Sequence, residues 1–240
     1  MNYLLLASSK SAFFFPLVVA IVVCGIVSYY YFNKKAVILR KLSRTPLKRS
    51  NNFKTNEVVT INGKALHVEA PLIAPFSKRK CVFYTMTIEQ KKSSGKNSYW
   101  DTIISEEKIQ TFFIENNGDF VIVEPTKNPK NYYSYLVQDK TAQSGTFNDP
   151  TPKFKALLEH YNIDSENFFG FNKGLRYSEG IIEIGEQLTV AGVSKWKQLK
   201  EPLPEYPYTK IAALVSNDKQ KLIITDLPEA KKQSKKLRRT

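Results

Sequence analysis

Acidic residues gather in the stretch LRYSEGIIEIGEQLTVAG, residues 175–192. Two carboxylates can act as general acid and base when their side chains face each other across a cleft. On one extended strand, Glu179 and Glu183 share a face but stand about 13 Å apart at ~3.3 Å per residue. Carboxylate pairs that hydrolyse glycosides stand roughly 5–9.5 Å apart. The alternating pattern therefore predicts a hairpin that turns at Gly185, with its charged residues outward or paired.

The remaining candidates for catalysis are isolated. His67 and His160 have no partner nearby in sequence, and a catalytic histidine needs one. Cys81 follows the basic triplet 78–80, which could lower the pKa of its thiol, although a cysteine that starts an apolar strand is also a small core residue. Two cysteines and two histidines exclude a zinc framework in practice. No catalytic residue, metal site or cofactor is therefore assigned.

An uncharged apolar run of 20 residues, FFFPLVVAIVVCGIVSYYYF, occupies positions 13–32. As a helix it would be about 30 Å long, which matches the hydrocarbon core of a bilayer. Tyr29, Tyr30 and Tyr31 stand where an interfacial aromatic belt belongs. The alternative is a cleaved signal peptide, but the run is long for one and no small-x-small cleavage site follows it. The run predicts a retained transmembrane helix.

The charges that flank this run predict its orientation. Lys10 alone precedes it, whereas eight Lys and Arg residues lie between positions 33 and 54. By the positive-inside rule, residues 1–12 would lie outside and the rest of the chain in the cytoplasm.

The net charge of +14 is concentrated in two segments. Residues 33–54 carry eight basic residues and residues 231–240 carry six, whereas residues 55–230 hold 21 basic and 22 acidic residues. A nucleic-acid-binding domain normally carries a basic patch on its own folded surface. No nucleic-acid partner is therefore expected, and steep salt dependence of DNA binding would indicate one.

The two basic segments instead favour contact with a membrane. Such clusters attract anionic lipid headgroups by about 1 kcal/mol per residue. The alternative is a topology signal and a soluble tail, since the same charges serve both roles. The residues expected at the inner leaflet are Lys34, Lys35, Arg40, Lys41, Lys235, Lys236, Arg238 and Arg239.

Between these segments, short strand patterns and Gly turns recur about every ten residues. Asn-Gly pairs predict hairpins within 57–70 and 111–125. Another hairpin is expected over 82–104, and a loop over 138–152. A capped helix is predicted at 151–161, since Thr151 can cap and Pro152 suits the first position. Further strands are expected at 132–137, 175–184, 186–194, 209–216 and 221–226. The fold class is mostly β, a small antiparallel barrel or sandwich with one inserted helix.

The order of these features resembles the GIDE domain, or "beside a membrane" domain, of the mitochondrial membrane-anchored ubiquitin ligase family and its bacterial relatives. The matching pieces are KRKCVFYTMTIE, YWDTI, TFFIENNGDFVIVEP, KALLEHYNI, LRYSEGIIEIGEQLTVAGVSKW and LIITDLPE. The residues that match the family pattern are Cys81, Tyr84, Trp100, Gly118, Pro125, Arg176, Glu179, Gly185 and Gly192.

The resemblance implies a membrane-proximal β domain that acts by binding a partner. In that family a second span and a RING follow the domain, and the ligase activity lies in the RING. Neither follows here, so ligase activity is not expected. Arg176 and Glu179 are interpreted as a structural pair.

These observations predict an extracytoplasmic segment 1–12, a transmembrane helix 13–32, a basic juxtamembrane segment 33–56, a GIDE-like β domain 57–229 and a basic tail 230–240. The expected function is that of a membrane-anchored, cytoplasm-facing module for protein interaction or envelope organisation. Its composition hints at a bacterial source. Arg176, Glu179 and Trp100 are the candidate residues for binding an unidentified protein partner. The alternative is a membrane-bound enzyme with a site near Cys81, Arg176 and Glu179, including a ligase-type activity.

Overall fold

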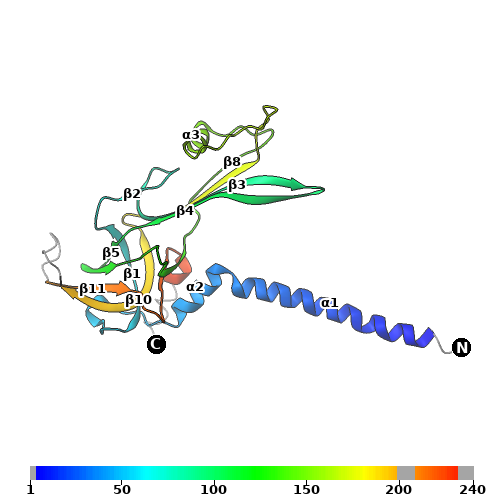
Figure 1. Ribbon diagram of the computed structural model, residues 1–240. Coiled ribbons are helices and arrows are strands. Elements are labelled where there is room, and N and C mark those ends of the chain that lie inside the picture. The colour runs from blue at the N-terminus through cyan, green and yellow to red at the C-terminus, as the bar shows by residue number, and fades with distance from the viewer. Residues whose placement is uncertain (1–3, 199–208, 232–240) are drawn as a thin grey trace. The chain divides into compact units, whose positions relative to one another are not determined.

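The apolar run forms most of helix α1 (Leu4–Phe32), which Figure 1 draws in dark blue. The computed structural model describes residues 4–198 and 209–231, and the chain divides into two units, 1–41 and 42–240. Within α1, Phe15–Phe32 has a mean hydropathy of 2.1 and none of it is buried. This stretch is long and apolar enough to cross a bilayer, and a signal sequence would share those properties.

Helix α2 (Lys34–Ser43) begins two residues after α1. Arg40 folds back onto the end of α1, where Nη1 donates a hydrogen bond of 3.2 Å to the carbonyl oxygen of Tyr31. The guanidinium carbon lies 3.9 Å from the centroid of the Tyr31 ring. This cation–π contact pairs a basic residue with the aromatic end of the apolar stretch.

The second unit contains a closed barrel, made within the described residues by strands β1 (Val58–His67), β5 (Phe112–Asn116), β6 (Asp119–Val123), β11 (Lys210–Val215) and β10 (Gln187–Gln198). These strands pair in that order, and β10 closes the ring on β1. The pairs are antiparallel except for β6 and β11, which are parallel. Buried apolar residues from all five strands fill the interior, including Val59, Ile61, Ile114, Val121, Val190 and Leu214.

Gly63 explains how the barrel closes. The hairpin expected at Asn62-Gly63 is wrong, because β1 runs straight through both residues. Residues 58–64 of β1 pair with β10, and residues 64–67 pair with β5. A Cβ atom at Gly63 would lie 2.3 Å from the carbonyl oxygen of Glu115. Glycine therefore allows β5 to approach closely where β1 changes partner.

The segment just before the barrel also belongs to the second unit. After the short 3-10 helix η1 (Ser50–Asn52), Phe53 is buried in the barrel core. Trp196 Nε1 donates a hydrogen bond of 3.2 Å to the carbonyl oxygen of Phe53. The folded part thus begins near Leu42 and includes much of the stretch expected as a juxtamembrane segment.

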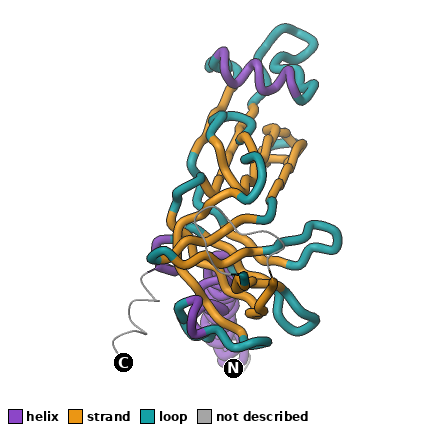
Figure 2. The backbone as a smooth tube through the Cα atoms, turned by 90° about the vertical axis from the view of Figure 1, so that its left-hand side faces the viewer, coloured by secondary structure: helices purple, strands orange, loops and turns teal. Residues whose placement is uncertain are grey.

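A second sheet extends from the barrel in the order β2 (Leu72–Ile73), β3 (Lys80–Ser94), β9 (Leu175–Glu183) and β8 (Lys140–Ser144), while β4 (Asn97–Ile109) also pairs with β3. Helix α3 (Pro152–His160) packs on one face of this sheet through Phe154 and Leu158, which contact Leu175 and Tyr177. Thr151 caps the helix by accepting a hydrogen bond of 3.3 Å from the N–H of Phe154. Figure 2 shows α3 at the end of this sheet remote from the barrel.

Several predictions of local structure are confirmed. The mostly β fold with a barrel and one inserted helix is present, with α3 close to the predicted range. The hairpin β5–β6 turns at Asn117 and Gly118, with φ angles of 54° and 85° that suit a tight hairpin turn. The long hairpin β3–β4 turns at Gly95.

Other expectations are corrected by the topology. Strands β9 and β10 follow each other in sequence but do not form a hairpin, because β9 lies in the second sheet and β10 in the barrel. The turn at Gly185 instead passes the chain from one sheet to the other. The stretch 138–152 is not only loop, since it contains β8. The strands expected at 132–137 and 221–226 are confirmed. They are β7 (Tyr132–Tyr135), the last strand in the order of its sheet, and β12 (Leu222–Thr225), which pairs in parallel with β7 and antiparallel with β10.

Candidate functional site

Arg176 and Trp100, both predicted as binding residues, meet on the face of the second sheet opposite α3. Arg176 donates hydrogen bonds of 2.5 and 2.9 Å from Nε and Nη2 to the carboxylate of Glu89. Its guanidinium carbon lies 4.4 Å from the centroid of the Trp100 ring. Strand register creates the group, because Glu89 opposes Arg176 and Lys91 opposes Trp100. We call Glu89, Trp100 and Arg176 the Arg176 triad.

Glu89 is the member of the triad that the sequence analysis missed. It lies on β3, whose alternate residues Met86 and Ile88 are buried on the other face. That alternation places Glu89 on the polar face, but its partner on β9 follows only from the register. The hydrogen bonds from Arg176 lower the pKa of Glu89, so its carboxylate is held ionised.

Beside the triad lies a shallow pocket of about 590 Å³. It lies between β3, β9 and β8, and polar side chains from all three strands line it. A hydrogen bond of 2.7 Å joins the hydroxyls of Thr87 and Ser178 next to it. The polar side chains that line the pocket are Glu89, Gln138, Thr141, Gln143, Arg176 and Ser178. This set offers hydrogen-bond donors, acceptors and a cation, but no nucleophile with a base beside it.

Glu179 lies on the opposite face of β9 and is fully buried. Its carboxylate accepts hydrogen bonds of 2.9 Å from the N–H of Phe76, 3.2 Å from the N–H of Ser77 and 2.8 Å from the hydroxyl of Tyr177. The predicted Arg176–Glu179 pair is therefore wrong, because residues three apart on a strand point to opposite faces. Glu179 fixes the turn between β2 and β3 and does not reach the surface.

Cys81 is also buried, among Ala74, Tyr84 and Ile181. Burial, together with the nearby carboxylate of Glu179, raises the pKa of its thiol to about 12. The guanidinium of Arg79 lowers this pKa, but by less than Glu179 raises it. The lowering expected from the basic triplet 78–80 is therefore wrong. The thiol is protonated at neutral pH, so it is a poor nucleophile.

The three residues of the alternative catalytic site do not converge. Cys81 is buried in the core, the carboxylate of Glu179 accepts hydrogen bonds from three buried or part-buried donors, and Arg176 lies on the opposite face of β9. No cleft with Cys81, Glu179 and Arg176 within hydrogen-bond reach of one another is present in the described part of the chain.

Charged residues also meet where the second sheet joins the barrel. Arg79 makes ion pairs of 3.0 Å with Glu183 and 3.5 Å with Asp139. Asp226 is buried nearby, and this burial, with the neighbouring carboxylates of Glu186 and Asp139, raises its pKa to about 6. Burial likewise raises the pKa of Glu186. Asp226, just after β12, accepts hydrogen bonds of 2.9 and 3.1 Å from the N–H of Val137, between β7 and β8, and its raised pKa predicts that stability at this junction depends on pH.

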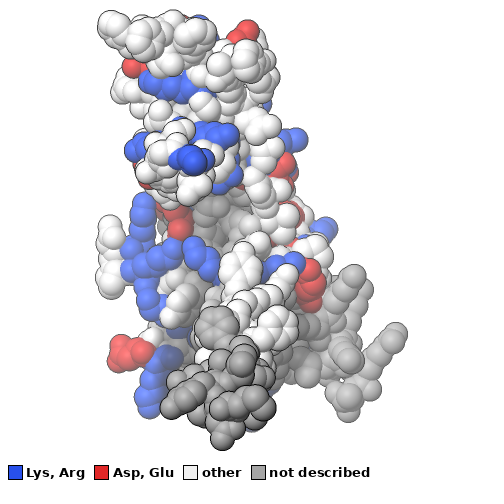
Figure 3. All heavy atoms as spheres, turned by 90° about the vertical axis from the view of Figure 1, so that its right-hand side faces the viewer, with Lys and Arg blue, Asp and Glu red and all other residues white. Residues whose placement is uncertain are grey.

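The predicted membrane-surface residues fall into two groups. Lys34, Lys35, Arg40 and Lys41 lie on α2. Lys235, Lys236, Arg238 and Arg239 lie outside the described residues. On the face shown in Figure 3, Lys and Arg lie over several parts of the second unit, with Asp and Glu beside them.

The histidines stand apart from these sites. His67 is exposed and its Nδ1 lies 2.9 Å from the carbonyl oxygen of Glu69, while the His160 ring packs edge-on against Tyr161. Over residues 4–198 and 209–231, no group of three His, Cys, Asp or Glu side chains could hold a metal ion. Cys24 and Cys81 are both free thiols.

Comparisons with known proteins identify no relative. No family model, no curated protein and no solved structure matches this chain. The Arg176 triad and its pocket are therefore interpreted from their own geometry.

Proposed function

We propose that this protein is a membrane-anchored, non-enzymatic module that binds a protein partner on the polar face of its second sheet. The observation that carries the proposal is the Arg176 triad. A guanidinium held by Glu89 and laid over Trp100 is a pre-oriented donor group at the edge of a polar pocket. Arginine and tryptophan are enriched among residues that dominate protein-protein binding.

The free edge of strand β8 indicates which conformation the bound segment of the partner would have. Within the described residues β8 pairs with β9 along one side, and its other side is an edge of the second sheet. An extended polypeptide can add to such an edge through main-chain hydrogen bonds, with nearby side chains supplying specificity. Thr141 and Gln143 of β8 line the pocket beside Arg176. We therefore assign an extended segment of another protein as the ligand.

Catalysis receives less support from the geometry. The thiol of Cys81 is buried with a raised pKa, and Glu179 is committed to the turn between β2 and β3. An enzyme, including one with a ligase-type activity, would need a reactive group that these residues do not supply. Binding needs only the polar surface that Arg176 and its neighbours present.

The anchor in this proposal is α1 as a single retained span. The basic residues that follow it favour an N-terminus outside and a second unit in the cytoplasm, where α2 and the C-terminal tail would contact anionic headgroups. The proposal also includes kinship with the GIDE domain of membrane-anchored ubiquitin ligases. Such a module would recruit a partner to the membrane or organise the envelope.

Site-specific photo-crosslinking in native membranes tests the binding face. A photoreactive residue replaces exposed Gln143, beside Arg176, in the full-length chain. The matched control carries it at exposed Lys219, in the turn between β11 and β12. We expect a discrete set of protein adducts from position 143 that is absent from position 219. The same adducts from both positions, or none from position 143, would contradict the proposal.

A further inference from the structure

Four phenylalanines project from the end of the second sheet that carries α3. The exposed fractions are 102% for Phe147, 98% for Phe168, 78% for Phe169 and 58% for Phe171. Single exposed apolar residues are common, but four large ones on neighbouring loops mark an interaction surface. We call these four residues the aromatic tip.

The aromatic tip is assembled from two loops. Phe147 lies between β8 and α3, and the other three lie between α3 and β9. A hydrogen bond of 2.5 Å from Asn172 Nδ2 to Asp149 Oδ1 ties the loops together. In Figure 2 both loops lie with α3 at one end of the second unit, and in Figure 3 that end, at the top, is drawn mostly white.

The loop before β9 is built to hold its phenylalanines outward. The side-chain oxygen of Asn167 accepts hydrogen bonds of 2.9 Å from the N–H of Phe169 and 3.1 Å from that of Phe171. The N–H of Asn167 donates to the carbonyl oxygen of Phe171 at 2.8 Å, and the N–H of Gly170 donates to that of Asn167 at 3.0 Å. Gly170 has a φ of 78°, which the tight turn requires.

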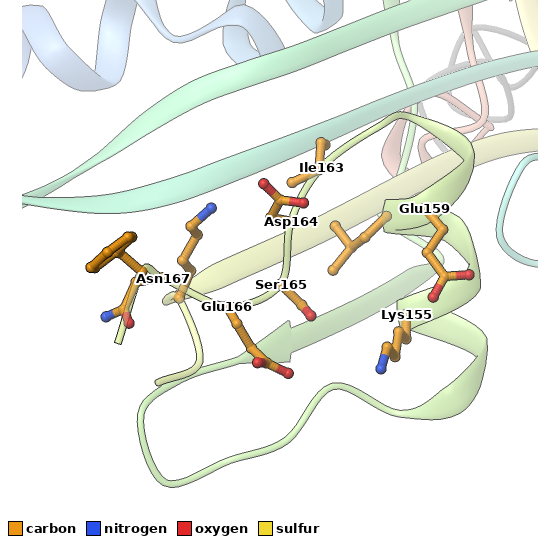
Figure 4. Close-up of a pocket in the computed structure, with 10 residues that line it drawn as sticks. Lys155, Glu159, Ile163, Asp164, Ser165, Glu166 and Asn167 are labelled. Atoms are coloured by element: carbon orange, nitrogen blue, oxygen red, sulfur yellow. The ribbon is translucent and has the colours of Figure 1, made fainter. Parts of the chain in front are cut away.

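The core beneath the tip is complete without these side chains. The apolar face of α3 packs on the sheet through Phe154, Leu157 and Leu158. A pocket of about 670 Å³ separates α3 from the following loop, and charged side chains such as Lys155, Glu159, Asp164 and Glu166 surround it (Figure 4). Phe168 also lines this pocket, but none of the four phenylalanines belongs to the core cluster around α3.

Two properties of the tip suit a lipid bilayer. Its turn satisfies the N–H groups of Asn167, Phe169, Gly170 and Phe171 internally, which lowers the cost of moving the loop from water into the membrane interface. Its charged neighbours are of both signs, so neither an acidic nor a basic macromolecule is favoured. Those neighbours are Lys153, Lys155, Lys173, Asp149, Glu159, Asp164 and Glu166.

An anchor in the same chain would hold the aromatic tip close to a membrane. If α1 is a retained span, as the proposed function holds, the second unit stays tethered to one bilayer at high effective concentration. Aromatic side chains partition favourably into the interface of such a bilayer. We infer that the aromatic tip inserts into the interface of the same bilayer that α1 crosses, an inference that rests on the proposed anchor. The contact would fix the orientation of the second unit on the membrane surface.

Lipid quenching in proteoliposomes tests this inference with the full-length chain. Cys24 is replaced by serine, and Phe169→Cys carries an environment-sensitive fluorophore; Cys81 is buried and stays unlabelled. Vesicles contain zwitterionic lipids with brominated acyl chains. We expect a blue-shifted emission that these chains quench at least twofold, and loss of both effects when Phe168 and Phe171 are replaced by aspartate.

Each other result overturns the inference in a recognisable way. Emission like that in water, with the chain retained after carbonate extraction, would refute insertion and leave the anchor intact. Release of the chain by carbonate would refute the anchor and the inference together. Quenching only by brominated lipids in added empty vesicles would place the tip in a second bilayer. Quenching that survives the two aspartate substitutions would show that the phenylalanines do not drive it.

Discussion

Arg176 donates two hydrogen bonds to Glu89 on the neighbouring strand while its guanidinium lies over the ring of Trp100. The side chains of Arg176 and Glu89 are 42% and 20% exposed, so solvent screens the ion pair. Pairs of this kind contribute under about 1 kcal/mol to folding. A substitution at Arg176 is therefore expected to leave the protein folded, so its effect on binding can be measured separately from its effect on stability.

Cys81 should be unreactive in the folded protein. In a Cys24→Ser background at pH 7.5, we expect maleimide labelling of Cys81 only after denaturation, because the thiol is buried and its pKa is raised to about 12. A cysteine at exposed Ser93 is the control and should react within minutes. Labelling of Cys81 at a similar rate would reopen the enzyme alternative.

Glu179 should be essential for stability. Glu179→Ala would leave the N–H groups of Phe76 and Ser77 and the hydroxyl of Tyr177 without their acceptor in a buried site. We expect the free energy of unfolding to fall by about 3–5 kcal/mol. Glu179→Gln should cost less because one acceptor oxygen remains. Denaturant titration measures both, with exposed Glu159→Ala as a near-neutral control, and equal stability of all three variants would refute this role.

Gly63 should tolerate no side chain. In Gly63→Ala the new methyl group would meet the carbonyl oxygen of Glu115 at 2.3 Å and the side chain of Ile114 at 2.4 Å. Separating β1 from β5 should cost on the order of 3 kcal/mol of unfolding free energy. Gly145→Ala is the matched control, since nothing lies within 4 Å of its added Cβ. Similar melting temperatures for the two variants would contradict the explanation of barrel closure.

Asp226 should make stability fall as pH rises. Burial raises its pKa from 3.8 to about 6, so between these values the folded state binds the proton that the unfolded state has lost. The stability that this proton provides is present below about pH 4 and is lost by about pH 6, a change on the order of 1–3 kcal/mol. Asp226→Asn should remove this part of the pH dependence.

Unfolding free energies from pH 4 to 7 measure the effect of Asp226. Exposed Asp218→Asn is the control, and its pH profile should match that of the unsubstituted chain. If Asp226→Asn also left the profile unchanged, the buried carboxyl would not be its source.

Local signals in the sequence predicted local structure well. Asn117-Gly118 predicted a hairpin turn, Thr151 and Pro152 predicted the start of α3, and alternation predicted most strands. Each of these signals depends on residues a few positions apart. Together they predicted the mostly β fold, and the uncharged apolar run at 13–32 predicted the helix α1.

The errors arose where distant segments decide the outcome. Asn62-Gly63 has the sequence of a turn, but pairing with Thr189 and Leu188 of β10 makes it part of a continuous strand. The pairing of β9 with β3 and β8, rather than with β10, depends on partners that no local pattern specifies. The same register joins Arg176 to Glu89 and buries Glu179. The sequence therefore indicated two of the triad residues but not their arrangement.

The yield of the crosslinked adduct at position 143 in an Arg176→Ala chain tests the central claim most directly. It is measured in native membranes against the unsubstituted chain, with unfolding free energies compared in parallel. We predict at least a tenfold lower yield with stability changed by under about 1 kcal/mol. An unchanged yield from a folded Arg176→Ala chain would show that the polar face around Arg176 does not bind the partner.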